Sequence, residues 1–270
     1  MNNINDNYYY GITQKVIKLA SDVAAYIDKE SLSFSIEKVE TKNRNDFVSY
    51  VDKQAEKLLV NGLSSLIPEA GFITEEGTAQ EYGENYCWII DPLDGTSNFI
   101  HGSTPYAISI ALTFKKELVV GVIHEITRNE SFYAWKGSKA YLNGNEIKVS
   151  KTNKVSNSLI ATGRPHNYIE HYTKLLGLMD YFLQNSHGVR QSGSAATDLA
   201  YVACGRYDGR YEFGLKPWDI AAGILIIQQA GGKVCDFSGN DNYFENGTFI
   251  ASNTELYDEL KSNVKYIFGN

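Results

Sequence analysis

The sequence predicts a layered fold of helices and β-sheets, with mixed α+β and α/β character, and three observations support this prediction. Apolar residues recur at helical spacing in two early segments, 12–27 and 51–66. A block of β-rich segments separated by turn residues follows, from 71 to 149. Strand-like and helical segments then alternate to residue 264, which is typical of sheet layers covered by helices.

The two early helices are expected to be amphipathic. Their apolar residues lie mostly three or four positions apart, on one helical face: Ile12, Val16, Leu19, Ala20, Val23 and Ile27, then Val51, Ala55, Leu58, Leu59, Leu63 and Leu66. Pro68 ends the second helix, because proline lacks the N–H that a continuing helix needs. Between the helices, Val39–Asp46 is polar and charged and predicts an exposed loop.

The β-rich block predicts an antiparallel sheet. Its strands are expected in the segments GFIT, CWII, AISIALTF, LVVGVIHEI and SFYAWKG, and Asn143-Gly144 is typical of a tight hairpin turn. The polar stretch Ser150–Ser158 then predicts a boundary. It divides an N-terminal α+β half, residues 1–150, from a C-terminal α/β half, residues 151–270.

The C-terminal half predicts strands and helices in alternation. Strands are expected in the segments LIATG, RYDGRYEF and GTFIAS, which are bounded by turn-forming residues. Helices are expected at Tyr168–Leu183, Ser194–Ala203, Asp219–Ala230 and Glu255–Val264.

Composition limits the classes of partner. The 32 acidic residues outnumber the 25 basic ones, and the net charge of −7 gives no support to a nucleic-acid partner. The cysteines are far apart and odd in number, which favours a reducing compartment over a disulfide framework. The N-terminus has no signal-peptide pattern, and no segment approaches the ~18 apolar residues of a membrane helix. A cytoplasmic protein without a membrane anchor is therefore expected.

Acidic residues stand at the ends of two apolar segments and near the starts of two predicted helices: Glu75 and Glu76, Asp91 and Asp94, Asp219, and Asp52. Taken singly, each is explained by a helix cap, a turn or an exposed position. Taken together, they point to the carboxyl ends of strands, where layered α/β folds bind ligands. Gathered carboxylates repel one another, and ligand sets of oxygen alone suit Mg²⁺, Ca²⁺ or Mn²⁺.

A glycine and two hydroxyl residues, Gly95, Thr96 and Ser97, follow these acids directly. The glycine allows close approach of the backbone, and such a turn can point its N–H groups at an anion. A divalent-metal site beside an anion-binding turn is typical of phosphoryl chemistry in which a metal-activated water attacks phosphorus. The residues therefore favour metal-dependent hydrolysis of a phosphate ester.

These motifs, in this order and spacing, resemble the inositol monophosphatase family. The residues that carry the resemblance are Asp52, Glu75-Glu76, DPLDGT at Asp91–Thr96, Trp218-Asp219 and Gly231-Gly232. The family belongs to the Mg²⁺-dependent, lithium-sensitive phosphatases, with fructose-1,6-bisphosphatases and nucleotide 3′-phosphatases. The resemblance implies an αβαβα sandwich, two or three Mg²⁺ ions and a homodimer.

The resemblance also implies a role for each site residue. The metal ligands would be Glu75, Glu76, Asp91, the Leu93 carbonyl, Asp94 and Asp219, with Asp91 shared by two ions. The catalytic residues would be Asp52 and Thr96, which orient and deprotonate the water, together with Glu75. Phosphate would bind at Gly95 and Thr96, and the alcohol part of the substrate would contact Gly193, Ser194, Ala195, Glu212 and Lys42.

Three readings of the function stay open. The first is hydrolysis of myo-inositol 1-phosphate or a similar small sugar phosphate. The second is a broader phosphatase for NADP⁺, fructose 1,6-bisphosphate or adenosine 3′,5′-bisphosphate, which Lys216 and four arginines expected at the surface or in interfaces keep open: Arg164, Arg190, Arg206 and Arg210. The third is a regulatory protein that binds a partner such as a transcription complex, a role that the resemblance implies for some bacterial members of the family. The complete set of carboxylates and Thr96 favours an enzyme.

Overall fold

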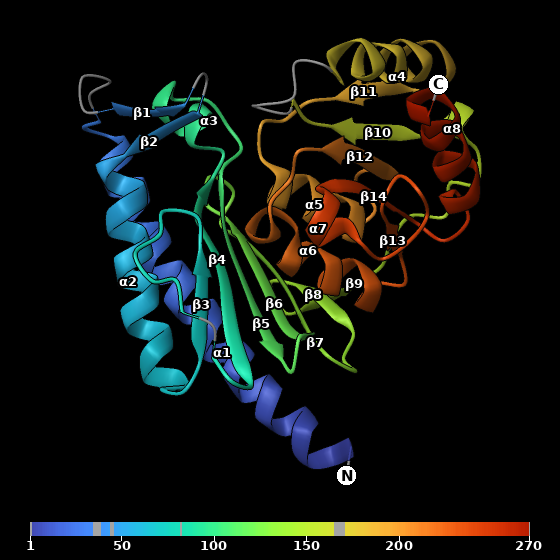
Figure 1. The fold of residues 1–270 in the computed structure, drawn as a ribbon. Helices are drawn as coiled ribbons and strands as arrows, with labels where there is room; N and C mark the ends of the chain where they lie inside the picture. The colour runs from blue at the N-terminus through green and yellow to red at the C-terminus, as the bar shows by residue number, and fades with distance from the viewer. Residues whose placement is uncertain (1, 35–38, 44–45, 82, 165–170, 270) are drawn as a thin grey trace.

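The computed structural model describes residues 2–34, 39–43, 46–81, 83–164 and 171–269, and the side chains of 2–6, 39–43 and 46–48 lie outside that description (Figure 1). The chain forms five layers in the order helix, sheet, helix, sheet, helix, which confirms the predicted αβαβα sandwich. The helical layers are α1 (Asn2–Ser31) with α2 (Tyr50–Leu66), α5 (Ala195–Ala203) with α6 (Pro217–Gln229), and α4 (Tyr172–Asn185) with α8 (Tyr257–Gly269).

The larger sheet has seven strands in the order β3-β4-β5-β6-β7-β8-β9. Their bounds are β3 Gly71–Thr74, β4 Tyr86–Asp94, β5 Ala107–Phe114, β6 Glu117–Glu125, β7 Glu130–Trp135, β8 Ala140–Leu142 and β9 Asn145–Ile147. The strands from β4 onward pair antiparallel, as expected, and both residues of the predicted Asn143-Gly144 turn have positive φ. The prediction was incomplete at one edge, because β3 pairs parallel to β4. That pairing brings the carboxyl ends of both strands to one edge of the sheet.

The smaller sheet has five strands in the order β11-β10-β12-β14-β13. Their bounds are β10 Leu159–Thr162, β11 Gly188–Arg190, β12 Gly209–Phe213, β13 Lys233–Cys235 and β14 Thr248–Ser252. Strand β10 runs parallel to both β11 and β12, and β14 runs antiparallel to β12 and β13. The short strands β11 and β13 were not predicted, because three residues carry too little pattern to stand out.

The segment predicted as an exposed loop, Val39–Asp46, contains regular structure instead. Strands β1 (Val39–Asn43) and β2 (Asp46–Ser49) pair antiparallel and lead directly into α2. The polar sequence misled the prediction, because a two-stranded ribbon does not need the alternating apolar side chains of a buried sheet.

Three hydrophobic cores hold the layers together. One lies between α1, α2 and the larger sheet, a second between that sheet and the α5–α6 layer, and a third between the smaller sheet and α4 with α8. Helices α5 and α6 belong to the C-terminal half but pack against strands of the N-terminal half. The division into two domains at residue 150 therefore stays a prediction. Within the described residues, no helix is long and apolar enough to cross a membrane.

Candidate active site

The parallel ends of β3 and β4 bring acidic residues together. Glu75 follows β3, and its N–H donates to the Ile90 carbonyl at 3.2 Å, beside the acids of β4. Asp91 and Asp94 lie in β4 and are 2% and 9% exposed. The local sequence explains this placement, because the apolar residues before Asp91 continue the strand into the core.

The start of helix α6 brings a further acid to this edge. Ser109 lies opposite Asp91 on β5, and its hydroxyl donates to the Trp218 carbonyl at 3.1 Å. That bond fixes the first turn of α6, in which the Lys216 N–H donates to Asp219 Oδ2 at 2.6 Å. Asp219 thus caps its helix, as an acid at this position commonly does, while also facing the β4 acids.

These acids interact electrostatically. Burial raises the pKa of Asp91 well above its usual range, and the negative charges of Glu75, Asp94 and Asp219 raise it further. Burial also raises the pKa of Asp219 to about 7. Carboxylates held this close resist ionising together, so a divalent cation with oxygen ligands fits the donor set well.

The acidic side chains are not arranged as a complete set of metal ligands in the described residues. Within the described residues, no group of three His, Cys, Asp or Glu side chains surrounds one point as a metal site would require. Three of the acids instead accept hydrogen bonds from N–H groups: Asp219 from Lys216, Asp94 from Ala195 and Ala196, and Asp91 from Leu93. Such partners are expected, because buried polar groups are generally hydrogen-bonded.

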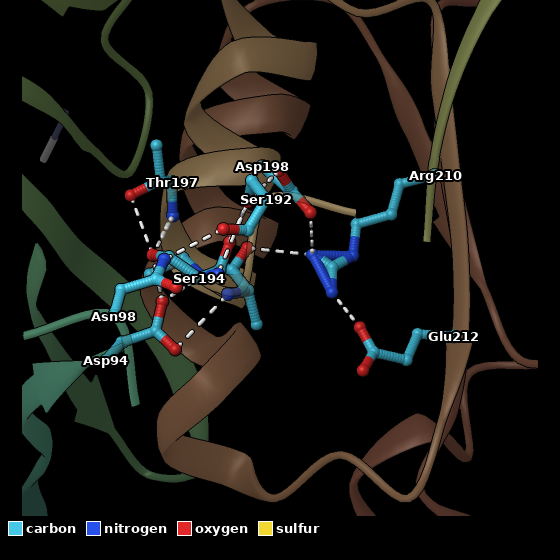
Figure 2. Close-up of polar contacts among 10 residues, drawn as sticks. Asp94, Asn98, Ser192, Ser194, Thr197, Asp198, Arg210 and Glu212 are labelled. Carbon is cyan, nitrogen blue, oxygen red and sulfur yellow. Dashed lines mark hydrogen bonds and ion pairs between the residues drawn. The ribbon is translucent and has the colours of Figure 1, made fainter. Parts of the chain in front are cut away.

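Asp94 is fixed by the first turn of α5 (Figure 2). Ser194 Oγ donates to Asp94 Oδ2 at 2.5 Å, the Ala196 N–H donates to the same oxygen at 2.6 Å, and the Ala195 N–H donates to Oδ1 at 3.2 Å. Residues 194 and 195, which the family resemblance assigned to substrate, thus also position a predicted metal ligand from 100 residues away in the chain.

The predicted catalytic pair is in contact. Thr96 Oγ1 lies 2.9 Å from Asp52 Oδ1 and 3.0 Å from the Leu93 carbonyl oxygen. Asp52 is fully buried near the start of α2, where Ser49 donates its N–H and its hydroxyl to Oδ2 at 2.8 and 2.5 Å. Burial raises the pKa of Asp52, against the lowering effect of these hydrogen bonds.

Gly95 and Gly193 meet where the two halves of the chain approach each other. Gly95 has a φ of 99°, and a Cβ there would lie 3.0 Å from the Pro105 carbonyl oxygen and 3.3 Å from that of Gly193. Asn98 reinforces the contact by donating to the carbonyls of Pro105 and Ser192 at 2.7 and 2.8 Å. Only glycine fits such a backbone approach without strain.

Glu56 is a buried acid near the site that was not predicted. Glu56 is fully buried on α2, and its carboxylate accepts from the N–H groups of Glu76 and Thr78 at 2.8 and 2.7 Å and from the hydroxyls of Thr74 and Thr78. It therefore ties down the loop that carries Glu75 and Glu76. A signal was present, because Glu56 is four residues after Asp52 and shares its helical face.

The expectation that Arg210 lies at the surface or in an interface was wrong. Its side chain is 1% exposed and forms ion pairs with Asp198 and with Glu212, the predicted substrate residue (Figure 2). The alternation of strand β12 explains the error, since it directs Arg210 and Glu212 to the same face of the sheet. Arg206 also has a partner, because it donates to both carboxylate oxygens of Glu130.

The remaining substrate prediction, Lys42, lies in strand β1, and its side chain falls outside the described part of the molecule. The structure thus brings three groups to one edge of the larger sheet: the acids of β3, β4 and α6, the Thr96–Asp52 pair, and the first turn of α5. Their arrangement combines acidic oxygens for a cation with a hydroxyl that can relay a proton.

Comparison with known proteins gives likenesses over most of the chain. A model of the inositol monophosphatase family matches residues 11–266. The Nus factor SuhB of Pseudomonas aeruginosa is 40% identical over 232 residues, which cover 84% of this chain and 86% of that protein. The solved structure of the extragenic suppressor protein suhB from Bartonella henselae has a TM-score of 0.89 and 36% identity, covering 94% of this chain and 98% of that one. The Thermotoga maritima IMPase has a TM-score of 0.86 and 34% identity, covering 94% and 96%.

Proposed function

The chain belongs to the inositol monophosphatase family, and we propose that it is a Mg²⁺-dependent phosphatase of small phosphate monoesters, with myo-inositol 1-phosphate as the leading substrate. The observation that carries this proposal is the contact of Thr96 with Asp52, 2.9 Å between oxygens, beside the mutually repelling acids around Asp91. A binding protein has no need for a proton relay next to a cation site.

The proposed metal ligands are the acidic side chains at the sheet edge and one carbonyl: Glu75, Asp91, Leu93 through its carbonyl, Asp94 and Asp219, with Glu76 near a third and weaker position. Bound Mg²⁺ would supply positive charge that polarises the phosphate and acidifies a water molecule. Asp91 would serve two ions, because the acids that interact with it lie on different sides of the chain: Glu75 after β3, Asp94 in the same strand β4, and Asp219 in α6.

The chain's own residues would take the proton from the attacking water. The Thr96 hydroxyl carries a single hydrogen, and donating it to Asp52 leaves the oxygen's lone pairs able to accept from water. Asp52 would receive the proton that Thr96 passes on. Its raised pKa favours that step, and Ser49 holds the carboxylate in the required orientation.

The turn after the acids would hold the phosphate. Helix α3 (Thr96–Ile100) begins directly after Gly95, and the first N–H groups of a helix have no partner within the helix. Because Gly95 has no side chain, an anion can approach the backbone closely. Gly193, Ser194, Ala195 and Glu212 would contact the alcohol part of the substrate.

A broader specificity remains the alternative within the same chemistry. Lys216 is exposed and stands directly before the first turn of α6, next to Asp219. A cation there can meet a second phosphate, as in fructose 1,6-bisphosphate, NADP⁺ or adenosine 3′,5′-bisphosphate. Lithium inhibition and a homodimer belong to the proposal by family likeness, and the three free cysteines fit a cytoplasmic location.

A regulatory role is the second candidate function. The observation that favours it is the name of a close relative, since the 40% identical protein of Pseudomonas aeruginosa is called a Nus factor. The two functions are compatible in one molecule, because an interaction surface need not include the acids around Asp91.

A phosphate-release screen tests the proposal. The four substrates named above would be offered with and without Mg²⁺, and with Li⁺ added in a parallel series. We expect Mg²⁺-dependent release that is fastest from myo-inositol 1-phosphate. Faster release from the bisphosphates or NADP⁺ would favour the broader phosphatase. Absence of release from all four, by protein that binds Mg²⁺, would contradict the enzyme proposal and favour the regulatory one.

A further inference from the structure

Arg210 is a buried cation that connects two parts of the site. It lies on β12, is 1% exposed, and points its guanidinium between α5 and the neighbouring acid of its own strand (Figure 2). Nη1 donates to the Ala195 carbonyl at 3.0 Å and to Asp198 Oδ2 at 3.2 Å, and Nη2 forms an ion pair with Glu212. A charge this deeply buried persists only when its partners are well placed.

On one side, Arg210 holds the turn that positions Asp94. The Ala195 carbonyl that it binds belongs to the residue whose N–H donates to Asp94 at 3.2 Å. Asp198, one turn further along α5, accepts from Ser192 Oγ at 2.6 Å and so ties the preceding loop to the same cation. The first turn of α5 is therefore clamped between Asp94 and Arg210.

On the other side, Arg210 fixes the carboxylate of Glu212. Strands β10 and β12 are parallel neighbours, and Gly163 follows the end of β10 next to Glu212. A Cβ placed on Gly163 would overlap the Glu212 carboxylate, so that carboxylate rests against bare backbone. Glu212 is 6% exposed, and its position is thus set by one guanidinium and one glycine.

The arrangement leaves Glu212 able to accept hydrogen bonds. An ionised carboxylate has about four acceptor positions, and the ion pair with Arg210 uses only one of its oxygens. Glu212 lies near the carboxyl end of a parallel strand, where layered sheets bind ligands. The groups that such an acceptor recognises are donors, and in a phosphate ester those donors are the hydroxyls of the alcohol.

We propose that Arg210 is a positioning residue that presents Glu212 to the hydroxyl groups of a polyhydroxylated alcohol, and that Gly163 provides the space this requires. The inference rests on the proposed function, in which Glu212 contacts the alcohol, and it adds which residues hold Glu212 for that contact. A purely structural ion pair would support all ligands equally, whereas a positioning role affects only ligands that carry hydroxyls.

Two variants disturb Glu212 by different routes. Arg210→Lys keeps the buried positive charge but loses the planar fork that reaches Ala195, Asp198 and Glu212 at once. Gly163→Ala keeps Arg210 and displaces the Glu212 carboxylate. Matched controls are Arg190→Lys, at an exposed arginine of the same sheet, and Gly11→Ala, where an added Cβ meets nothing within 4 Å.

Binding and turnover are measured separately. The Thr96→Ala background slows turnover about 10²-fold. Within the time that this allows, calorimetry with Mg²⁺ compares the binding of myo-inositol 1-phosphate with that of inorganic phosphate. We expect both variants to lower the affinity for myo-inositol 1-phosphate about tenfold, as for loss of a hydrogen bond to a charged group. The affinity for inorganic phosphate should fall less than about twofold. In the active protein, KM for myo-inositol 1-phosphate should rise while kcat/KM for 4-nitrophenyl phosphate stays within the range of the controls.

The outcomes separate this inference from the function on which it rests. An equal loss of affinity for both ligands, or no loss for either, would overturn the positioning role of Arg210. Wild-type protein that releases no phosphate from any ester would refute the proposed function, while the calorimetric comparison would still decide the role of Arg210. If Arg210→Lys does not fold, Gly163→Ala tests the placement of Glu212, because it leaves Arg210 and its contacts with Ala195 and Asp198 in place. Equal weakening of the binding of both ligands, or none, by this variant would then overturn the proposal.

Discussion

Two buried acids, Glu56 and Asp91, lie close to the same loop and have opposite surroundings. Glu56 is surrounded by donors, since two N–H groups and two hydroxyls of the loop after β3 point at its carboxylate. Asp91 accepts one N–H, from Leu93 at 3.0 Å, and faces three further acids. The protein satisfies Glu56 by itself, whereas Asp91 is left with a negative field that a cation from solution would neutralise.

The difference teaches how to separate a structural acid from a functional one. Both side chains are almost inaccessible to water, with exposures of 0% and 2%, so burial alone does not distinguish them. The partners do, because donors stabilise the ionised form and neighbouring acids destabilise it. Removing the charge of Glu56 should therefore weaken the fold, and removing that of Asp91 should weaken catalysis.

The largest expected effect is that of Asp91→Asn on activity. The variant loses a ligand proposed to serve two Mg²⁺ ions, so phosphate release should fall by more than about 10³-fold. The melting temperature without metal should stay the same or rise, because one member of a repelling group becomes neutral. Phosphate release and calorimetric melting check both parts. Near-normal release would remove Asp91 from the metal site.

Thr96→Ala should have the next largest effect. It removes the hydroxyl between the water and Asp52, so kcat should fall by about 10²-fold, a typical contribution of general base catalysis. Calorimetric Mg²⁺ affinity should change little, since the Leu93 carbonyl stays in place. Thr96→Ser is the matched control and should retain most of the activity. A large loss of Mg²⁺ affinity with normal kcat would contradict the proton relay.

Glu56→Gln should mainly affect stability. The amide nitrogen would face a donor, so one hydrogen bond of the buried loop is lost and the free energy of unfolding should fall by about 2 kcal/mol. Urea unfolding measures the change. Glu69→Gln, at an exposed glutamate beyond the same helix, is the control. Unchanged stability with lost catalysis would place Glu56 in the functional group instead.

The smallest expected effect is a dependence of stability on pH without metal. The pKa of Asp219 is raised to about 7 in the folded protein, so the folded state binds a proton more tightly than the unfolded chain does. Stability should then decrease as the pH rises from about 4 to 7, by a few degrees in melting temperature. Asp219→Asn should flatten this slope relative to wild type. Millimolar Mg²⁺ should raise the wild-type melting temperature most above pH 7.

Much of the fold could be predicted from the sequence, because its main elements carry strong patterns. The apolar spacing of α1 and α2 and the Asn143-Gly144 turn are local signals, and the structure confirms them. The parallel pairing of β3 with β4 has no local signal, since it depends on a partner strand more than ten residues away. The β1–β2 ribbon also lacks a local signal, because its polar sequence is typical of a loop.

The candidate site divides in the same way. Asp91, Asp94 and Thr96 stand in one short motif, so their grouping could be predicted before the fold was known. The partners of Arg210 could not, because a lone arginine is usually exposed and its burial depends on Asp198 and Glu212 arriving from two elements. The only signal for Glu56 was its place four residues after Asp52, on a helix that the sequence analysis had assigned to packing.

The way in which α5 holds Asp94 has a consequence for how such a protein can diverge. Ala195 contributes its main-chain N–H, which every amino acid except proline also possesses. The Ala195 side chain therefore takes no part in holding Asp94. The residue also borders the region proposed for the alcohol. Mutation at this position can retune which compounds are accepted while the catalytic apparatus is inherited unchanged.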